Sequence, residues 1–129
     1  MEYPSDLKYM STHEWIRVKG DKGVVGISDF AQHELSDVVY VELPSVGDNV
    51  TAGNQCAVVE SVKSASDIYS PVTGSISRVN EEVNNAPDTV NKDPYGEGWL
   101  FEVELEDPSE LDNLMDAKAY QKQLESEKA

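Results

Sequence analysis

Short runs of β-branched and aromatic residues, separated by turns rich in Gly, Pro, Asn and Asp, fill the chain from about residue 14 to residue 105. This pattern is typical of an all-β sandwich or barrel, in which each run forms one strand. In the last run, Phe101, Val103 and Leu105 alternate with Glu102 and Glu104. That strand should therefore be half-buried. The strands predicted in this way are residues 15–18, 24–27, 38–43, 56–62, 67–70, 75–79 and 100–105.

Two segments between these runs have a different character. Asp29 is followed three residues later by Gln32, which resembles a capping box and predicts a short helix over about residues 30–35. Residues 80–98 are rich in Asn, Pro, Asp and Gly. We expect this stretch to be a long surface excursion with at most one helical turn near Asp88.

A C-terminal helix is predicted over about residues 108–124. Asp107 suits the N-cap, Pro108 suits the first helical position, and Glu110 lies three residues after the cap. The tail over residues 125–129 should be frayed. The expected apolar stripe of this helix consists of Leu111, Leu114, Met115 and Ala119.

The chain is long enough for one domain but too short for two. With 129 residues and a mass of 14.2 kDa, residues 1–129 can bury a single core. The 25 acidic and 10 basic residues give a net charge of −15. The electrostatic field of so negative a protein repels phosphate backbones and anionic lipids. We therefore expect neither nucleic-acid binding nor membrane binding. No apolar run approaches the roughly 20 residues that span a bilayer.

The first residues resemble neither a secretory signal nor an organellar transit peptide. We therefore expect the chain to remain where it is made, in the bacterial cytoplasm, or in the mitochondrial matrix if it is a processed eukaryotic form. Cys56 is the single cysteine and cannot form an internal disulfide. Since it lies in an apolar run over residues 56–59, it is interpreted as a core thiol.

Most kinds of catalytic or metal site lack the residues they need. One cysteine together with His13 and His33 does not approach a tetrahedral zinc set, so no metal site is expected. The glycines near residue 23 lack the residues that complete a phosphate-binding loop. Carboxylates are so numerous that their presence alone indicates no acid–base catalysis.

Lys63 is the residue that stands out. It lies between two runs that read as the arms of a hairpin, and small residues follow it directly. A lysine on such a turn can enter the active site of another enzyme. The alternative is an ordinary solvated lysine, as most surface lysines are.

A family resemblance of the residues around Lys63 favours the first of these two interpretations, a lysine that enters the active site of another enzyme. The sequence Glu60-Ser61-Val62-Lys63-Ser64 and its continuation to Gly74 resemble the lipoylation hairpin of the H protein of the glycine cleavage system. The resemblance covers residues 7 to about 125. Further matching segments are residues 7–9, 13–15, 25–28, 31–32, 41–44, 46–47, 90–91, 94–95, 98–99, 110–111, 114–117 and 120.

Related carrier domains fit less well. Biotin carriers have a Met on each side of the modified lysine, where this chain has Val62 and Ser64. Acyltransferase lipoyl domains usually have an Asp before the lysine and lack the elements appended at both ends. The resemblance thus implies a mainly β fold, a flattened barrel-sandwich hybrid of lipoyl-domain type with a short internal helix and a C-terminal helix.

The resemblance also implies a function as a non-catalytic carrier. Lys63 would bear lipoate in amide linkage, and this arm would carry the aminomethyl group of glycine from glycine decarboxylase (P protein) to the aminomethyltransferase (T protein). Dihydrolipoyl dehydrogenase (L protein) would reoxidise the arm, and a lipoate-attaching enzyme would install it. By the same resemblance, Thr12, Glu14 and Asp67 would line the cleft that holds the arm, with Ile27 as an apolar wall.

The chain departs from the family at one point. Members often have a histidine at the positions of Phe30 and Glu34, and His33 is the candidate to replace it. Glu14 and Asp67 could alternatively be ordinary solvated acids. Two other functions are kept as alternatives: an H-like lipoyl relay protein that donates lipoate or serves another complex, and an unmodified acidic adaptor that binds basic partner surfaces.

Overall fold

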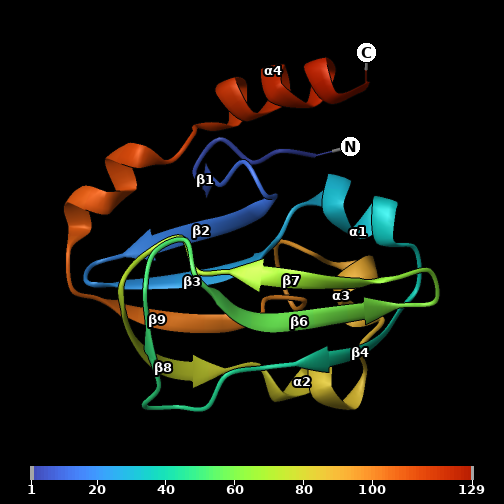
Figure 1. The fold of residues 1–129 in the computed structure, drawn as a ribbon, viewed down its shortest axis with the longest axis horizontal. Helices are drawn as coiled ribbons and strands as arrows, with labels where there is room; N and C mark the ends of the chain where they lie inside the picture. The colour runs from blue at the N-terminus through green and yellow to red at the C-terminus, as the bar shows by residue number, and fades with distance from the viewer. Residues whose placement is uncertain (1, 129) are drawn as a thin grey trace.

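Two antiparallel sheets build the molecule, as the computed structural model shows for residues 2–128 (Figure 1). The larger sheet has the strand order β1-β2-β3-β9-β8-β5, and the smaller has the order β4-β6-β7. The strands are β1 (Lys8–Tyr9), β2 (Glu14–Lys19), β3 (Lys22–Ile27), β4 (Val38–Glu42), β5 (Asn49–Val50), β6 (Gln55–Ser61), β7 (Ala65–Tyr69), β8 (Gly74–Val79) and β9 (Phe101–Leu105). The helices are α1 (Asp29–Leu35), α2 (Glu81–Asn85), α3 (Thr89–Lys92), the 3₁₀-helix η1 (Pro108–Asn113) and α4 (Ala117–Lys128).

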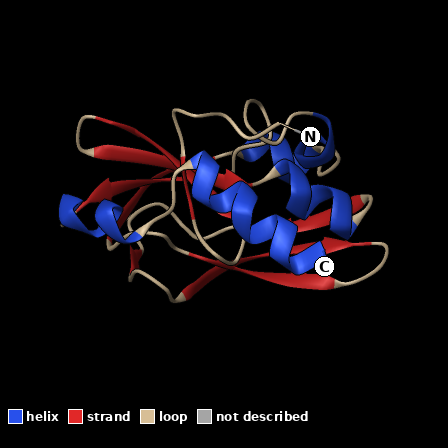
Figure 2. Cartoon of the chain, turned by 90° about the horizontal axis from the view of Figure 1, so that it is seen from above, coloured by secondary structure: helices blue, strands red, loops and turns tan. Residues whose placement is uncertain are grey.

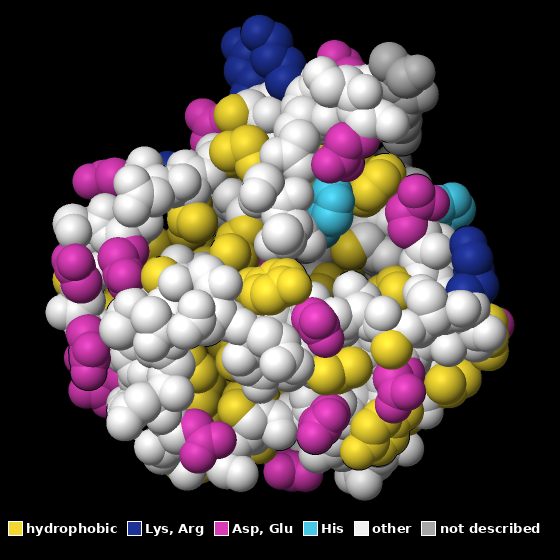
Figure 3. Space-filling model, in the orientation of Figure 1, with side chains coloured by type: hydrophobic (Ala, Val, Ile, Leu, Met, Phe, Trp, Pro, Cys, Tyr) yellow, Lys and Arg dark blue, Asp and Glu magenta, His cyan; other side chains and the backbone are white. Residues whose placement is uncertain are grey.

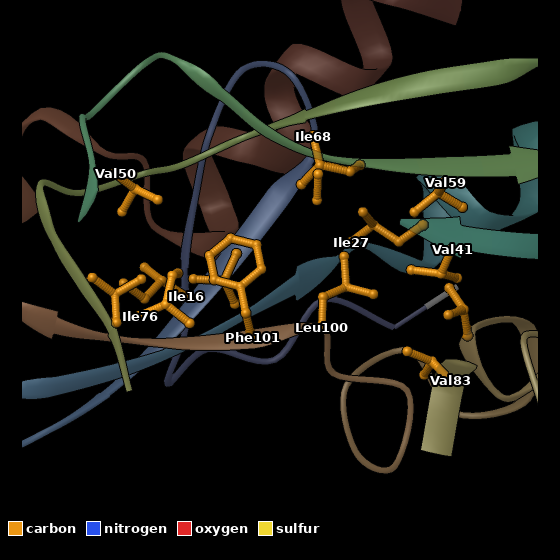
Figure 4. Close-up of a cluster of buried hydrophobic side chains, with 14 of the residues drawn as sticks. Ile16, Ile27, Val41, Val50, Val59, Ile68, Ile76, Val83, Leu100 and Phe101 are labelled. Atoms are coloured by element: carbon orange, nitrogen blue, oxygen red, sulfur yellow. The ribbon is translucent and has the colours of Figure 1, made fainter. Parts of the chain in front are cut away.

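The main core lies between the two sheets (Figure 4). Ile16 and Phe101 come from the larger sheet, and Val41, Val59 and Ile68 come from the smaller one; all five are buried. Because the side chains of a strand alternate between its faces, each sheet can give one apolar face to this core. The predicted mainly β sandwich with an internal helix and a C-terminal helix is confirmed.

All seven predicted strands are present, with ends within about two residues of those predicted. The two-residue strands β1 and β5 were not predicted. The prediction that β9 is half-buried is wrong in one respect, because Glu102 is buried as well. Its carboxylate accepts hydrogen bonds from Ser77 Oγ at 2.8 Å and Arg78 at 2.9 Å, and the Arg78 guanidinium lowers the pKa of Glu102.

Helix α1 occupies the predicted place but has a different cap. Its N-cap is Ser28, whose Oγ accepts a hydrogen bond from the Ala31 amide at 3.2 Å. Asp29, the predicted cap, lies inside the helix and accepts a hydrogen bond from the Gln32 side chain at 2.8 Å. The helix ends at Ser36, whose φ of 66° turns the chain in a left-handed conformation.

The predicted C-terminal helix over residues 108–124 is two helices. Asp107 caps η1 as expected, since its side chain accepts a hydrogen bond from the Ser109 amide. The helix stops at Leu114, which is extended, because Met115 exchanges two backbone hydrogen bonds with Tyr9, at 2.8 and 2.9 Å. Pairing with β1 requires an extended chain and therefore interrupts the helix.

Helix α4 begins after this interruption and lies over the strands, as Figure 2 shows from above. It buries Ala117, Tyr120 and Leu124 in a second apolar cluster, whereas Ala119 of the predicted stripe is exposed. The other three residues of that stripe, Leu111, Leu114 and Met115, are partly buried. Residues 125–128, predicted to fray, are helical, and residue 129 lies outside the described residues.

The excursion over residues 80–98 is more ordered than predicted. It contains α2 and α3, which bury Val83 and Val90 in the main core. Asn80 fixes its start, because the Asn80 side chain accepts from the Glu82 amide and donates to the carbonyls of Glu97 and Trp99. These side-chain bonds replace the regular backbone pairing that a strand would supply.

Candidate functional site

Lys63 lies exposed at the tip of the β6–β7 hairpin. Ser61 shapes this tip: its backbone amide donates to the Ser64 carbonyl at 2.8 Å, and its Oγ accepts from the amides of Lys63 and Ser64, both at 3.1 Å. Local bonds of this kind give a tight turn without help from the core. The Lys63 Nζ donates to the Glu34 carbonyl at the end of α1, at 3.3 Å.

A cavity of about 500 Å³ opens beside this hairpin, between α1, the end of β3 and the last turn of α4. Figure 3 shows hollows in this face of the molecule, which bears hydrophobic and acidic side chains. Apolar side chains from α1 and from the ends of β3 and β7 make up much of the wall. The lining residues are Thr12, His13, Ile27, Phe30, Ala31, Glu34, Leu35, Ser64, Ser66, Ile68 and Glu127.

Glu14 lies directly behind Thr12. Its side chain is only 1% exposed, and its two oxygens accept hydrogen bonds from the Thr12 hydroxyl and from the Tyr69 amide. Burial raises the pKa of Glu14 to about 7, although both hydrogen bonds act to lower it. A carboxyl group that changes charge near neutral pH therefore supports the wall of the cavity.

The structure brings three of the four predicted cleft residues together. Thr12 and Ile27 line the cavity, and Glu14 contacts it through Thr12. Asp67 is exposed and is not among the lining residues, whereas its neighbours Ser66 and Ile68 are. Successive side chains of a strand point to opposite faces, which places Asp67 on the outer face of β7.

The histidine that lines the cavity is not the one that the sequence analysis proposed. His33, the predicted substitute, is exposed and does not line the cavity, but His13 does. Burial lowers the pKa of His13, and the charges of Glu127 and Glu34 act in the opposite direction. No sequence signal could have placed Glu127 here, because its position depends on where α4 begins.

The Tyr120 hydroxyl connects α4 both to the cap of α1 and to His13. The imidazole Nδ1 lies 2.7 Å from the Tyr120 hydroxyl, which lies 2.7 Å from Ser28 Oγ, the cap of α1. The imidazole Nε2 lies 3.6 Å from a carboxylate oxygen of Glu127. Two walls of the cavity are thereby held in a fixed relation.

The remaining candidate chemistry is sparse over residues 2–128. Cys56 is only partly buried, but it packs against the core, and burial raises the pKa of its thiol to about 12. In this part of the chain, no three His, Cys, Asp or Glu side chains are placed to hold a metal ion together. None of the helices described over these residues is both long and apolar enough to pass through a bilayer.

Comparisons with known proteins agree over almost the whole chain. A family model described as Glycine cleavage H-protein matches residues 7–127. The glycine cleavage system H protein of Idiomarina loihiensis is 56% identical over 125 residues, which are 96% of this chain and 97% of that protein. That of Aeromonas hydrophila is 57% identical over 125 residues, with the same coverage. A crystal structure of a glycine cleavage system H protein from Mycobacterium marinum has a TM-score of 0.87 and 40% identity, and covers 94% of this chain and 98% of that one.

Proposed function

Because this chain belongs to the glycine cleavage H-protein family, the non-catalytic lipoyl carriers of the glycine cleavage system, we propose that it bears its lipoyl group in amide linkage on Lys63. The observation that carries this proposal is the position of Lys63, exposed at a tightly bonded hairpin tip beside a cavity. An attaching enzyme can reach this amine, and an arm fixed there can reach the cavity. The family assignment favours this function over the lipoyl relay and the unmodified adaptor.

The cavity suits a mainly hydrocarbon arm with a polar end. Its volume of about 500 Å³ falls within the range of small-ligand sites. Ile27, Phe30 and Ile68 offer apolar contact, and Glu34 and Glu127 add negative charge. When bound, the lipoyl group supplies reversible thiol–disulfide chemistry, while the protein supplies position and protection.

Thr12, Glu14, Ile27 and Asp67 are proposed to hold the loaded arm. The Thr12 hydroxyl donates its proton to Glu14, so its oxygen lone pairs remain available to accept from an ammonium group. Glu14 fixes the orientation of that hydroxyl and contributes negative charge once it is ionised. Ile27 is the apolar wall, and Asp67 would act from the outer side of β7.

Four partners follow from this role. They are glycine decarboxylase, the aminomethyltransferase, dihydrolipoyl dehydrogenase and a lipoate-attaching enzyme. The net charge of −15 suits partners whose docking surfaces are basic. The bacterial cytoplasm, or the mitochondrial matrix for a processed eukaryotic form, stays the predicted compartment.

The attachment site is tested by mass. Co-expression with a lipoate ligase in the presence of free lipoate should add one lipoyl group to the chain, as measured by intact-mass spectrometry. Lys63→Arg should abolish this addition, whereas Lys22→Arg, at another exposed lysine, should leave it unchanged. Modification that persists in Lys63→Arg would contradict the assignment.

The arm cleft is tested by the lifetime of the loaded carrier. Thr12→Val, Glu14→Ala and Asp67→Ala should each be lipoylated and reoxidised like the parent, but should release formaldehyde faster when tetrahydrofolate is absent. Loss of a charge-assisted hydrogen bond predicts about a tenfold effect. Glu104→Ala, at an exposed acid on the other sheet, is the control. Parental lifetimes in all three variants would make these residues ordinary wall and surface residues, and Lys63 would still be the proposed site.

A further inference from the structure

Exposed apolar side chains gather on one side of the molecule. Over residues 2–128, five large hydrophobic side chains are exposed, and four of them lie on β4, in the loop that follows β4, or at the hairpin tip. We call these four the β4 strip: Val39 (54% exposed), Tyr40 (53%), Val46 (63%) and Val62 (66%). The fifth, Val18, lies on β2 in the larger sheet.

An irregularity in β4 creates part of this strip. Val38 pairs with Ser61 and Tyr40 pairs with Glu60, so that Val39 has no partner on β6. Such bulges turn two successive side chains of an edge strand away from the core. The β4 strip also borders an open groove of about 450 Å³, lined by Tyr40, Val46 and neighbouring residues.

The β4 strip continues to Lys63. Val62 directly precedes the lysine, and the Val62 amide donates to the Asp37 carbonyl at 3.0 Å, which fixes the hairpin tip against the chain entering β4. A protein surface that covers Lys63 would therefore also reach Val62 and the start of β4. Contiguous exposed apolar side chains of this kind mark interaction sites.

Apart from Lys63, the charged residues of the strands and loops that carry the β4 strip are acidic. Lys63 is the only Lys or Arg between residue 23 and residue 77, whereas Asp37, Glu42 and Glu60 lie on or beside the strip's strands. Figure 3, which looks onto β6 and β7, shows hydrophobic and acidic side chains mixed over these strands. The fitting partner surface has an apolar centre with Lys or Arg around it.

We propose that the β4 strip is the docking surface for the enzyme that attaches lipoate to Lys63. This inference rests on the proposed function of Lys63. Of the four partners, only that enzyme must bring its reactive centre to Nζ itself, while the others act on the far end of the arm. There the amide forms between Nζ and the acyl carbon of an activated lipoyl donor, the bond from that carbon to its leaving group breaks, and the ammonium group releases two protons.

The test is a lipoylation assay with purified apo-protein, a lipoate ligase, lipoate and ATP, followed by intact mass. The double variant Val39→Ser/Tyr40→Ser should lower kcat/KM by about tenfold, mainly through KM, because truncating an exposed aromatic anchor weakens docking. Val18→Ser is the matched control and should react like the parent. Unfolding midpoints should agree among all three proteins, since the changed side chains are exposed.

A second pair of variants tests the charge. Glu42→Lys, beside the β4 strip, should raise KM several-fold, whereas Glu104→Lys, an equal charge change on the other sheet, should not. Parental kcat/KM in Val39→Ser/Tyr40→Ser would overturn the docking proposal and leave Lys63 as the attachment site. An equal loss of kcat/KM in Val18→Ser would also overturn the docking proposal. The same holds if the double variant is impaired only in the reaction with glycine decarboxylase and not in lipoylation. Attachment of lipoate to a lysine other than Lys63 in the parent would instead overturn the proposed function.

Discussion

Glu14 shows how strongly a single residue depends on its surroundings. It is almost fully buried, both of its carboxylate oxygens are hydrogen-bonded, and its pKa of about 7 lies far above the usual value of 4.5. Because the folded protein binds this proton more tightly than the unfolded chain does, the group stabilises the fold at low pH. This contribution is lost as pH rises from about 4.5 through 7.

Unfolding of Glu14→Gln should therefore depend on pH differently from that of the parent. Between pH 4.5 and 8, we expect the free energy of unfolding of the parent to fall relative to that of Glu14→Gln by about 3 kcal/mol, as measured by urea denaturation. Glu104→Gln, at an exposed acid, should follow the parent throughout. Parallel curves for the parent and Glu14→Gln would mean that the pKa of this carboxyl in the folded protein is close to its value in the unfolded chain.

Individual site residues could be predicted only in part. The place of Lys63 at the tip of a hairpin could be predicted, because a tight turn is specified by adjacent residues such as Ser61. His13 and Glu127 were not identified, because their approach to the cavity depends on the packing of α4 against β1. Asp67 was assigned to the cleft from resemblance, and the alternation of β7 places it on the outer face.

Among the elements, α4 adds one buried hydroxyl, that of Tyr120, to its apolar contacts with the rest of the molecule. Tyr120→Phe removes the hydrogen bonds to Ser28 and His13 while keeping the ring that stacks on Tyr9. We expect a loss of about 1 to 3 kcal/mol in the free energy of unfolding, because Ser28 stays fully buried and His13 partly buried after the hydroxyl is removed. Tyr40→Phe, at an exposed tyrosine, should change stability by less than about 0.5 kcal/mol.

The pairing of β8 with β9 depends on one glycine. A Cβ added at Gly74 would lie 1.9 Å from the Glu104 carbonyl oxygen and 2.8 Å from Val103 Cγ1. The backbone of β9 cannot move away without breaking the ladder, so Gly74→Ala should destabilise the protein by about 3 kcal/mol. Ser75→Ala is the neighbouring control, and a shared denaturation midpoint for both variants would show that β9 can adjust.

Among the secondary-structure elements, strands were easier to predict from the sequence than helices. Apolar and acidic residues alternate visibly only in the sequence of β9. β2 and β3 bury successive residues and were predicted from their β-branched and aromatic residues, which lie between turn-forming residues. The break between η1 and α4 was missed, since it results from hydrogen bonds between Met115 and Tyr9, residues 106 positions apart. The ordered excursion containing Val83 and Val90 was missed because its polar composition concealed two buried side chains.

For the whole molecule, we expect the excess of acidic residues to speed encounters with partners whose docking surfaces are basic. Charges of opposite sign attract over about 10 Å at 0.1 M salt and less at higher concentrations. With the carrier limiting, turnover with the aminomethyltransferase should therefore fall as NaCl is raised from 50 to 500 mM. The rate with free lipoamide in place of the carrier corrects for effects of salt on the enzyme. A salt-independent apparent affinity would contradict electrostatic steering.

The two chain ends lie near the cavity, and this restricts how the protein can be labelled. Glu127 lines the cavity, and the Glu2 amide donates to Asp29 at the start of α1, so both ends are on the same side of the molecule (Figure 1). A fluorophore or affinity tag joined to either end would crowd the cavity that is proposed to hold the arm. The exposed turn at Gly20 and Asp21, between β2 and β3, lies at the opposite end of the sheet and is the better attachment point for a reporter.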